Sequence, residues 1–138
     1  MVSRVFHSGL SAIGILVWGN ILAVSARWRG VTPTVRFIKR MTPWLPSAKG
    51  DLDDYSDRID GLLKTVPFLF YARRQGCLIR GLLLFFFGKR RKLAIELHFG
   101  SKIVDQTFNS HCWIILDGEI RFEVDSVIQQ YTTLVEYT

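Results

Sequence analysis

The sequence contains few cysteines and no nucleic-acid-binding signature, and each shortage excludes a class of protein. Cys77 and Cys112 are the only cysteines among 138 residues, too few for a disulfide framework and without the paired spacing of a structural zinc site. Free thiols are typical of a protein in a reducing cytoplasm. No RNA- or DNA-binding module accompanies the net charge of +6, so we expect no nucleic-acid partner. The charge still fits an acidic peptide or a membrane surface.

Length and composition bound the number of domains. A chain of 138 residues with 49% hydrophobic content can bury one core, so we expect a single domain over residues 1–138. Within it, residues 1–66 have the pattern of helices, and residues 67–138 combine one apolar helix with strands.

The N-terminal part contains a long apolar run, Leu10–Ala26. At 17 residues it is at the short limit for a membrane crossing, and Asn20 interrupts it. We therefore expect a packed helix, or a helix that touches a membrane through residues 10–26. A cleaved signal or an anchor remains the alternative, because Arg4 precedes the run and Val24–Ala26 resembles a signal-peptidase site.

Prolines divide the next stretch into shorter elements. Three of them make Gly30–Gly50 linker-like, with a short basic helix around Arg36–Arg40. Asp51–Val66 has the apolar spacing of an amphipathic helix, which Pro67 should end. Its five aspartates lack the glycine turn and terminal glutamate of a calcium loop, so they predict a solvated helix face and no metal site.

A cysteine stands where a second apolar helix should begin. Gly76 precedes Cys77, and the run Leu82–Phe87 is typical of a buried helix, with Gly88 as its C-cap. Helix N-termini leave backbone N–H groups unpaired and carry about half a positive charge, so the pKa of a thiol in the first turn is lowered. Cys77 is therefore a candidate nucleophile.

The rest of the chain changes to the two-residue period of strands. Leu93–Phe99 alternates apolar and polar side chains. Ser110–Leu116 and Glu119–Val124 are two further runs, and the Asp-Gly pair between them is a strong hairpin signal. Helices followed by antiparallel strands predict an α+β fold, in which a small antiparallel sheet packs on the helix that follows the cysteine.

His111 lies in the first strand of that hairpin and can serve as the base that a thiol nucleophile needs. The hairpin register decides which acid orients it. A three-residue loop over 116–118 places Glu123 opposite His111, with Asp125 on the same face at diagonal distance. A two-residue loop over 117–118 places Val124 opposite and turns both acids to the other face. We expect the first register, with Glu123 as the orienting acid and Asp125 in reserve.

These residues resemble a known family. The segments Gly76–Arg80 (GCLIR) and His111–Gly118 (HCWIILDG) are similar to the transglutaminase-like cysteine peptidase of lasso peptide biosynthesis, the B protein or its stand-alone C-terminal half. The resemblance implies Cys77 as nucleophile, His111 as base and Glu123 as the acid. It also implies a transglutaminase or papain-like cysteine peptidase core, which we place in residues 67–138.

The resemblance further implies an activity and partners. Such a peptidase cleaves the leader from a ribosomal lasso precursor peptide, after which a separate lasso cyclase closes the freed core. A winged-helix recognition protein captures the leader. Residues 1–66 lack the strands of such a domain, so we expect this partner to be a separate chain. No cofactor is expected, and the expected location is the cytoplasm, with membrane association left open.

Several further residues have two interpretations each. Arg80 is a candidate substrate contact or a packed side chain, and Trp113 can contact substrate, shield the imidazole or fill the core. His98 is a less favoured alternative base. Cys112 replaces the alanine of the family pattern, and we expect a small core residue that turns away from the candidate base. Ile115 stands where a glutamate is frequent, so that acid is absent or replaced elsewhere.

A second class of function remains open on the same sequence. The chain could be a non-catalytic transglutaminase-fold module or a membrane-associated binding module. In that case the cysteine would have an ordinary pKa of about 8.5 and would react slowly with alkylating reagents.

Overall fold

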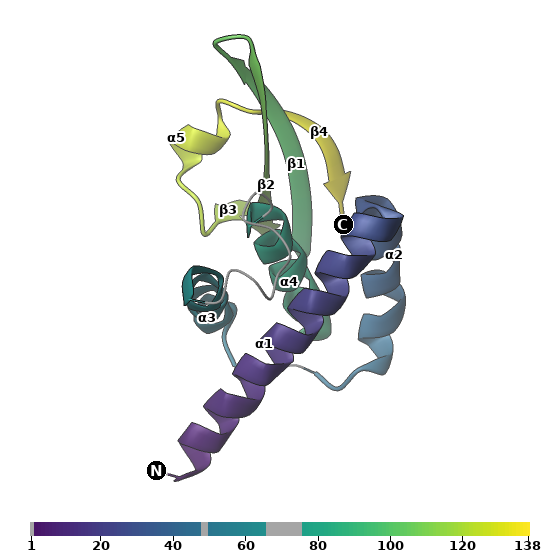
Figure 1. The fold of residues 1–138 in the computed structure, drawn as a ribbon, viewed down its shortest axis with the longest axis vertical. Coiled ribbons are helices and arrows are strands. Elements are labelled where there is room, and N and C mark those ends of the chain that lie inside the picture. Colours follow the sequence, from purple (N-terminus) through teal and green to yellow (C-terminus); the bar gives the residue numbers. More distant parts are fainter. Residues whose placement is uncertain (1, 48–49, 66–75) are drawn as a thin grey trace.

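The computed structural model describes residues 2–47, 50–65 and 76–138. The helices are α1 (Val2–Arg29), α2 (Val31–Met41), the 3-10 turn η1 (Thr42–Trp44), α3 (Leu52–Thr65), α4 (Gly76–Arg90) and α5 (Asp125–Ile128). The strands are β1 (Ile95–Val104), β2 (Thr107–Leu116), β3 (Glu119–Arg121) and β4 (Thr132–Tyr137). Helices α1 to α4 gather toward one end of the molecule and the antiparallel sheet toward the other, with the short α5 beside the sheet (Figure 1), which confirms the predicted α+β fold.

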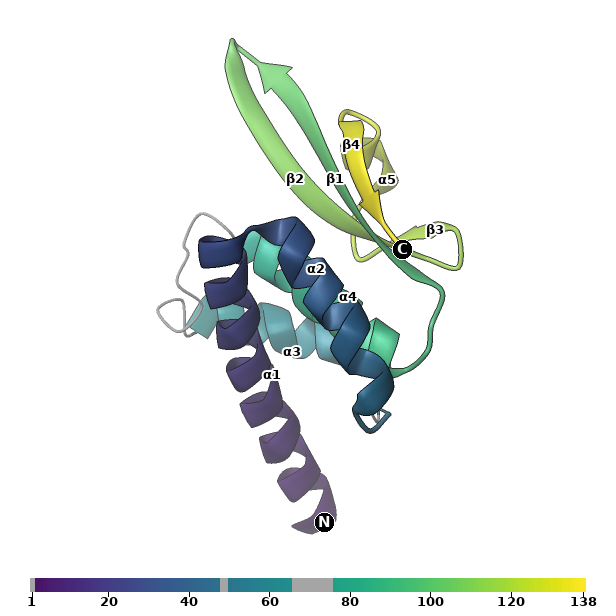
Figure 2. The ribbon, with the colours of Figure 1, turned by 90° about the vertical axis from the view of Figure 1, so that its right-hand side faces the viewer.

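Helix α4 is the centre of this arrangement. It contacts α1, α2 and α3 as well as β1 and β2, and Figure 2 shows it between the other helices and the sheet. Ile79 and residues 81–88 are all buried. A helix that is apolar all round must be enclosed on every side, so the sequence of α4 itself requires this central place.

The end of α4 differs from the prediction. Gly88 lies inside the helix, where a Cβ would stand 2.5 Å from the Cδ1 atom of Ile95. The helix ends instead at Arg90, and Lys92, two residues later, has a left-handed φ of 57°. The Leu93 N–H donates to the Gly88 carbonyl at 3.0 Å, and the Lys92 N–H to the Lys89 carbonyl at 3.0 Å. Gly88 as C-cap is therefore wrong, because close packing on β1 is what requires the glycine.

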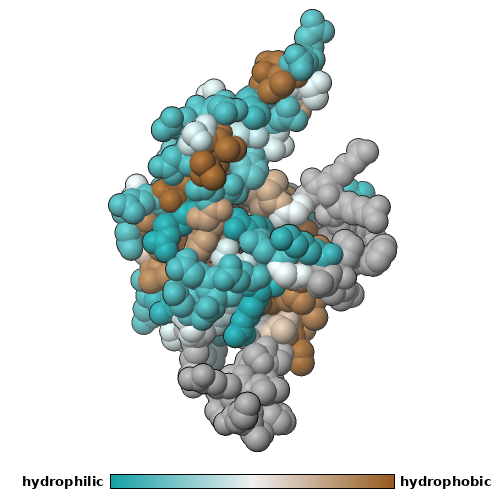
Figure 3. Space-filling view, turned by 90° about the vertical axis from the view of Figure 1, so that its left-hand side faces the viewer, coloured by the Kyte–Doolittle hydropathy of each residue, from teal (hydrophilic) through white to brown (hydrophobic). Residues whose placement is uncertain are grey.

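The sheet has the strand order β3-β2-β1-β4, and every neighbouring pair is antiparallel. The sequence did not indicate β4, which pairs with β1. Nor did it indicate the β1–β2 turn, where Asp105 and Gln106 adopt φ of 49° and 62° without a glycine. This hairpin extends well beyond the helices (Figures 1 and 2). Near its tip Figure 3 shows a hydrophobic patch, and the cross-strand pair Ile103 and Phe108 is exposed there.

The β2–β3 connection corrects the expected register. Leu116 pairs with Glu119, so the loop consists of Asp117 and Gly118 alone. Their φ values of 52° and 81° are both positive, as in a type I′ turn, whose twist matches the flanking strands. The three-residue loop is therefore wrong. Strand β3 also ends at Arg121, so no strand pairing connects His111 to an acid.

The N-terminal apolar run forms part of α1, which continues through residues 24–26 to Arg29. Ile15 and Leu22 are fully buried in the core, so α1 is a packed helix. Over the described part of the chain, the helices lack the combination of length and apolar character needed to cross a membrane. The face of α1 opposite the core carries a stripe of exposed apolar side chains: Ile13, Val17, Ile21, Val24 and Trp28.

The two helices between α1 and α4 follow the sequence closely. The basic helix expected within Gly30–Gly50 is α2, which tolerates Pro33 because the first turn of a helix leaves N–H groups unpaired. The amphipathic helix expected over Asp51–Val66 is α3. The expected stop at Pro67 and the turn before Gly76 lie outside the described residues.

Candidate active site

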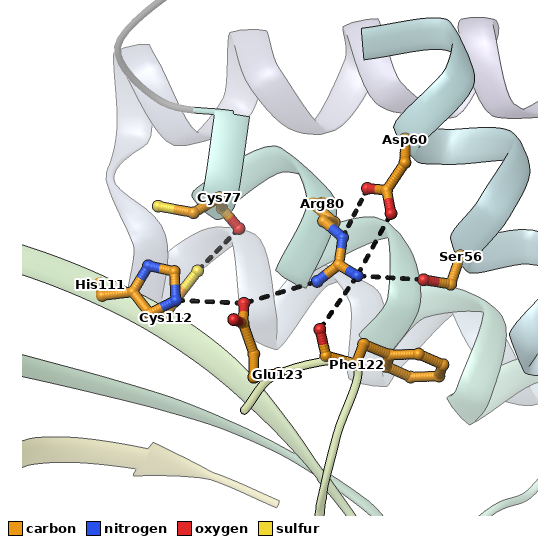
Figure 4. A network of polar contacts seen from close by, with 8 residues as sticks. All are labelled: Ser56, Asp60, Cys77, Arg80, His111, Cys112, Phe122 and Glu123. Carbon is orange, nitrogen blue, oxygen red and sulfur yellow. Dashed lines mark hydrogen bonds and ion pairs between the residues drawn. The ribbon is translucent and has the colours of Figure 1, made fainter. Parts of the chain in front are cut away.

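Three parts of the chain meet at the start of α4. Cys77 is the second residue of that helix, His111 lies on β2, and Glu123 follows β3. Figure 4 shows the imidazole of His111 between the thiol of Cys77 and the carboxylate of Glu123. The structure thus brings together all three residues that the sequence predicted as nucleophile, base and acid.

Glu123 reaches His111 by a route that strand pairing does not provide. The chain leaves β3 at Phe122, whose φ of 66° is left-handed and turns the next residue back toward β2. An oxygen of Glu123 then lies 3.1 Å from Nε2 of His111. The reserve acid, Asp125, is exposed in the first turn of α5. Glu123 is therefore the acid in contact with the histidine.

The surroundings of Cys77 favour its thiolate. Hydrogen bonding from Cys112 and then from His111 lowers the pKa of Cys77 from 9.0 to about 4, against the opposing effect of burial. The unpaired N–H groups at the start of α4 favour negative charge at the same place. The lowered pKa favours the thiolate at neutral pH, and because Cys77 is only half-buried its sulfur stays within reach of a substrate.

The pKa of His111 is shifted in the opposite direction, upward. Hydrogen bonding to Cys77 raises the pKa of His111 above 6.5, burial opposes this, and the charge of Glu123 adds to the rise. Thiolate and imidazolium therefore stabilise each other. Such an ion pair is the activated state of a cysteine nucleophile, with the proton already held by the future acid catalyst.

Arg80 holds the carboxylate end of this chain of contacts. Its Nε atom lies 2.7 Å from an oxygen of Asp60, and its Nη1 atom lies 3.7 Å from Glu123. Its Nη2 atom also donates to Ser56 at 3.1 Å and to the Phe122 carbonyl at 3.5 Å. The guanidinium thus connects α3 to the segment that carries the acid.

This arrangement decides between the two interpretations of Arg80. Its guanidinium is engaged by groups of the protein itself and faces Glu123 (Figure 4), so we assign it a positioning role in place of a substrate contact. Two aspartates of the predicted solvated face are also paired. Asp60 binds Arg80, and Asp53 lies 3.2 Å from Arg121. Neither pair could be predicted from local sequence, since each joins residues far apart in the chain.

Two aromatic rings, those of Trp113 and Tyr131, pack near the imidazole of His111. The ring centroids of His111 and Trp113 are 6.4 Å apart, and Trp113 is only 4% exposed. The sequence did not indicate Tyr131. Its ring centroid lies 5.5 Å from that of His111 and 6.2 Å from that of Trp113. Gly100 makes room for this packing, because a Cβ there would lie 2.6 Å from the Trp113 ring. Trp113 therefore both fills space and shields the imidazole.

Cys112 is buried, as expected, and its thiol faces Cys77 on α4. Its thiol lies 2.8 Å from the backbone carbonyl of Cys77 and donates a hydrogen bond to it. It also contacts the Cys77 side chain, and this contact, followed by burial, raises the pKa of Cys112. His111 and Cys112, neighbours on β2, thus both contact Cys77.

The alternative base has other partners. Nε2 of His98 lies 2.7 Å from Glu96, and Nδ1 lies 3.8 Å from Glu136. These carboxylates hold His98 on the sheet, and the imidazole that contacts the candidate nucleophile is that of His111.

The protein thus has an α+β fold in which a cysteine at the start of a helix lies beside a histidine on a strand of the sheet. A family model of the transglutaminase-like superfamily matches residues 21–136. That range covers most of the chain, so the protein belongs to the transglutaminase-like superfamily, which includes cysteine peptidases. Searches of the curated proteins and of the solved structures found no significant match.

Proposed function

We propose that the protein is a cysteine peptidase that removes the leader from a ribosomally made lasso precursor peptide. The observation that carries this proposal is the position of His111 between the Cys77 thiol and Glu123, whose carboxylate lies 3.1 Å from its Nε2 atom. A nucleophile, a base and an orienting acid in this order are the parts that thiol-dependent acyl transfer requires.

The chemistry follows from the two shifted groups. The Cys77 thiolate attacks the scissile carbonyl carbon, and the N–H of Cys77 is a donor for the resulting oxyanion. The imidazolium of His111 gives its proton to the leaving amine, which departs and leaves a thioester. His111 then takes a proton from water, the hydroxide displaces the thiolate, and the acid product leaves. Glu123 keeps the imidazole oriented through both steps.

The choice of substrate rests on the sequence motifs. The segments 76–80 and 111–118 resemble the leader peptidase of lasso peptide biosynthesis, and the superfamily match is compatible with that assignment. The freed core amine would pass to a separate cyclase. Ribosomal precursors are made in the cytoplasm, where the two free thiols would also stay reduced, so we place the protein there.

A separate winged-helix recognition protein is part of the proposal, and we place its docking site on α1 and α2. A shallow apolar groove lies there, lined in part by Ile21, Val24 and Phe37. Arg29, Arg36 and Arg40 surround the adjoining hollow. An apolar groove with an arginine rim suits a partner surface that is apolar with acidic residues around it.

Precursor cleavage in vitro tests the function. The purified protein is incubated with a lasso precursor and its recognition protein, and the products are identified by mass. Cleavage at one bond between leader and core is expected, with none for Cys77→Ala and a strong loss for His111→Ala. Full cleavage by either variant would overturn the assignment. Binding of the precursor without any cleavage by the unaltered protein would favour a non-catalytic module.

A further inference from the structure

We propose that Cys77 and Cys112 form a reversible disulfide when the protein meets a hydroperoxide, so that Cys112 protects the nucleophile from irreversible oxidation. The thiol chemistry does not depend on the peptidase assignment. Only its consequence, reversible loss of cleavage, rests on the proposed function.

The Cys112 thiol lies next to the backbone of Cys77. The Cys112 sulfur lies 2.8 Å from the carbonyl oxygen of Cys77. That oxygen is two bonds from its own Cα, so the sulfur lies within about 5 Å of the Cys77 Cα, a separation that side-chain rotation can close to a disulfide. Hydrogen bonding with the Cys112 side chain is also the first cause of the lowered pKa of Cys77, which agrees with this proximity. The pair comes from two different elements, α4 and β2, both anchored in the core.

The two thiols differ in the way that a sensing and a resolving cysteine differ. Cys77 is half-buried and ionised, so it is the sulfur that reacts first with a peroxide. Cys112 is 4% exposed, and its pKa is raised, so it stays protonated and protected while Cys77 is a thiolate. The first cause of that raised pKa is the contact with Cys77 itself. Oxidation removes the charge on Cys77 and therefore releases Cys112 to react.

The steps balance with one hydroperoxide as the oxidant. The Cys77 thiolate attacks the terminal oxygen, an S–O bond forms, the O–O bond breaks, and the departing oxygen takes a proton that the imidazolium of His111 can supply. Sulfur loses two electrons and becomes a sulfenic acid. The Cys112 sulfur then displaces the sulfenic oxygen, which leaves as water with the thiol proton. A dithiol returns two electrons and two protons and restores both thiols.

Gly81 explains why the second thiol fits so close to the nucleophile. A Cβ at Gly81 would lie 3.0 Å from the Cys112 sulfur and 2.9 Å from Leu97, so the glycine is what lets β2 approach α4 at this point. The fit also guides the choice of variant. Cys112→Ala removes only the sulfur from a buried position and needs no added space.

Mass spectrometry of the peroxide-treated protein tests the proposal. The folded protein is exposed to hydrogen peroxide, denatured, alkylated and digested. We expect the loss of two hydrogens, a peptide pair joined through Cys77 and Cys112, and no alkylation at either cysteine. Dithiothreitol should restore alkylation at both. In Cys112→Ala, whose folding is checked by circular dichroism, Cys77 should instead trap dimedone as a sulfenic acid and then pass to sulfinic acid, which dithiothreitol does not reverse.

Two results would overturn the proposal. One is sulfinic acid at Cys77 with Cys112 still open to alkylation in the unaltered protein. The other is a disulfide between two copies of the chain, seen as a dimer on a non-reducing gel. Neither depends on peptidase activity, so a protein that cleaves nothing can still confirm the disulfide. Where cleavage is observed, dithiothreitol should restore it to the unaltered protein and not to Cys112→Ala.

Discussion

Nε2 of His111 lies 3.1 Å from the carboxylate of Glu123, although no pair of strand positions brings the two residues together. The chain leaves the sheet one residue after β3, and the left-handed Phe122 turns Glu123 back across β2. The acid is therefore held by a loop, and Arg80 of α4 joins that loop to Asp60 of α3.

Loss of the Glu123 charge should impair catalysis without loss of binding. Glu123→Gln removes a charge that raises the pKa of His111, so the alkaline limb of the pH profile should move to lower pH. We expect kcat to fall about 10²-fold or more, with little change in KM, because the imidazole is no longer oriented. Asp125→Asn is the matched control, and an equal loss in that variant would assign the orienting role to Asp125.

The pH dependence of alkylation should report the thiolate of Cys77. Because its pKa is lowered to about 4, the rate with iodoacetamide should rise near pH 4 and stay nearly flat through neutral pH, instead of rising near 9.0. His111→Ala should move the rise to higher pH, since it removes the second cause of the shift. A rise only above pH 8 in the unaltered protein would contradict the ion pair.

Cleavage should follow a bell-shaped profile for the same reason. The reaction needs the thiolate of Cys77 and the imidazolium of His111 together. Its acid limb should fall near pH 4, and its alkaline limb should fall above 6.5, because the pKa of His111 is raised. Initial rates of precursor cleavage across the pH range provide the measurement, and an alkaline limb below 6.5 would refute the pairing.

Arg80 should act through Glu123. Arg80→Lys loses the geometry that joins Asp60 at 2.7 Å to Glu123 at 3.7 Å, so kcat should fall about ten- to a hundredfold with KM nearly unchanged. Arg121→Lys is the matched control, because Arg121 pairs with Asp53 of the same helix in a more exposed site. If Arg80 bound substrate, the effect would fall mainly on KM.

Two glycine substitutions separate packing from helix propensity. Gly88→Ala places a Cβ 2.5 Å from Ile95 and should lower the free energy of unfolding by about 1–3 kcal/mol. Gly14→Ala meets no atom within 4 Å in α1 and should raise it by up to about 1 kcal/mol. Denaturant unfolding measures both changes in the free energy of unfolding. If the two changes were equal, the close contact of Gly88 with Ile95 would not be what disfavours a larger residue there.

Much of the secondary structure of this protein can be predicted from local sequence. Apolar runs, proline positions and periodicity predict α1 to α4 and the change to strands, because these patterns are properties of neighbouring residues. Local sequence also predicts that Cys77 lies at the start of a helix. The motifs around Cys77 and His111 indicated these two residues as nucleophile and base.

Tertiary structure decided what local sequence could not. The register of the β2–β3 hairpin, the path that delivers Glu123, the pairing of Arg80 with Asp60 and the contact of Cys112 with Cys77 each join residues from different elements. Such contacts depend on how elements pack, and packing depends on the volume of side chains far apart in the chain. The sequence by itself indicated Cys77, His111 and Glu123, and the fold determined the path by which they meet and added the contacts of Arg80 and Cys112.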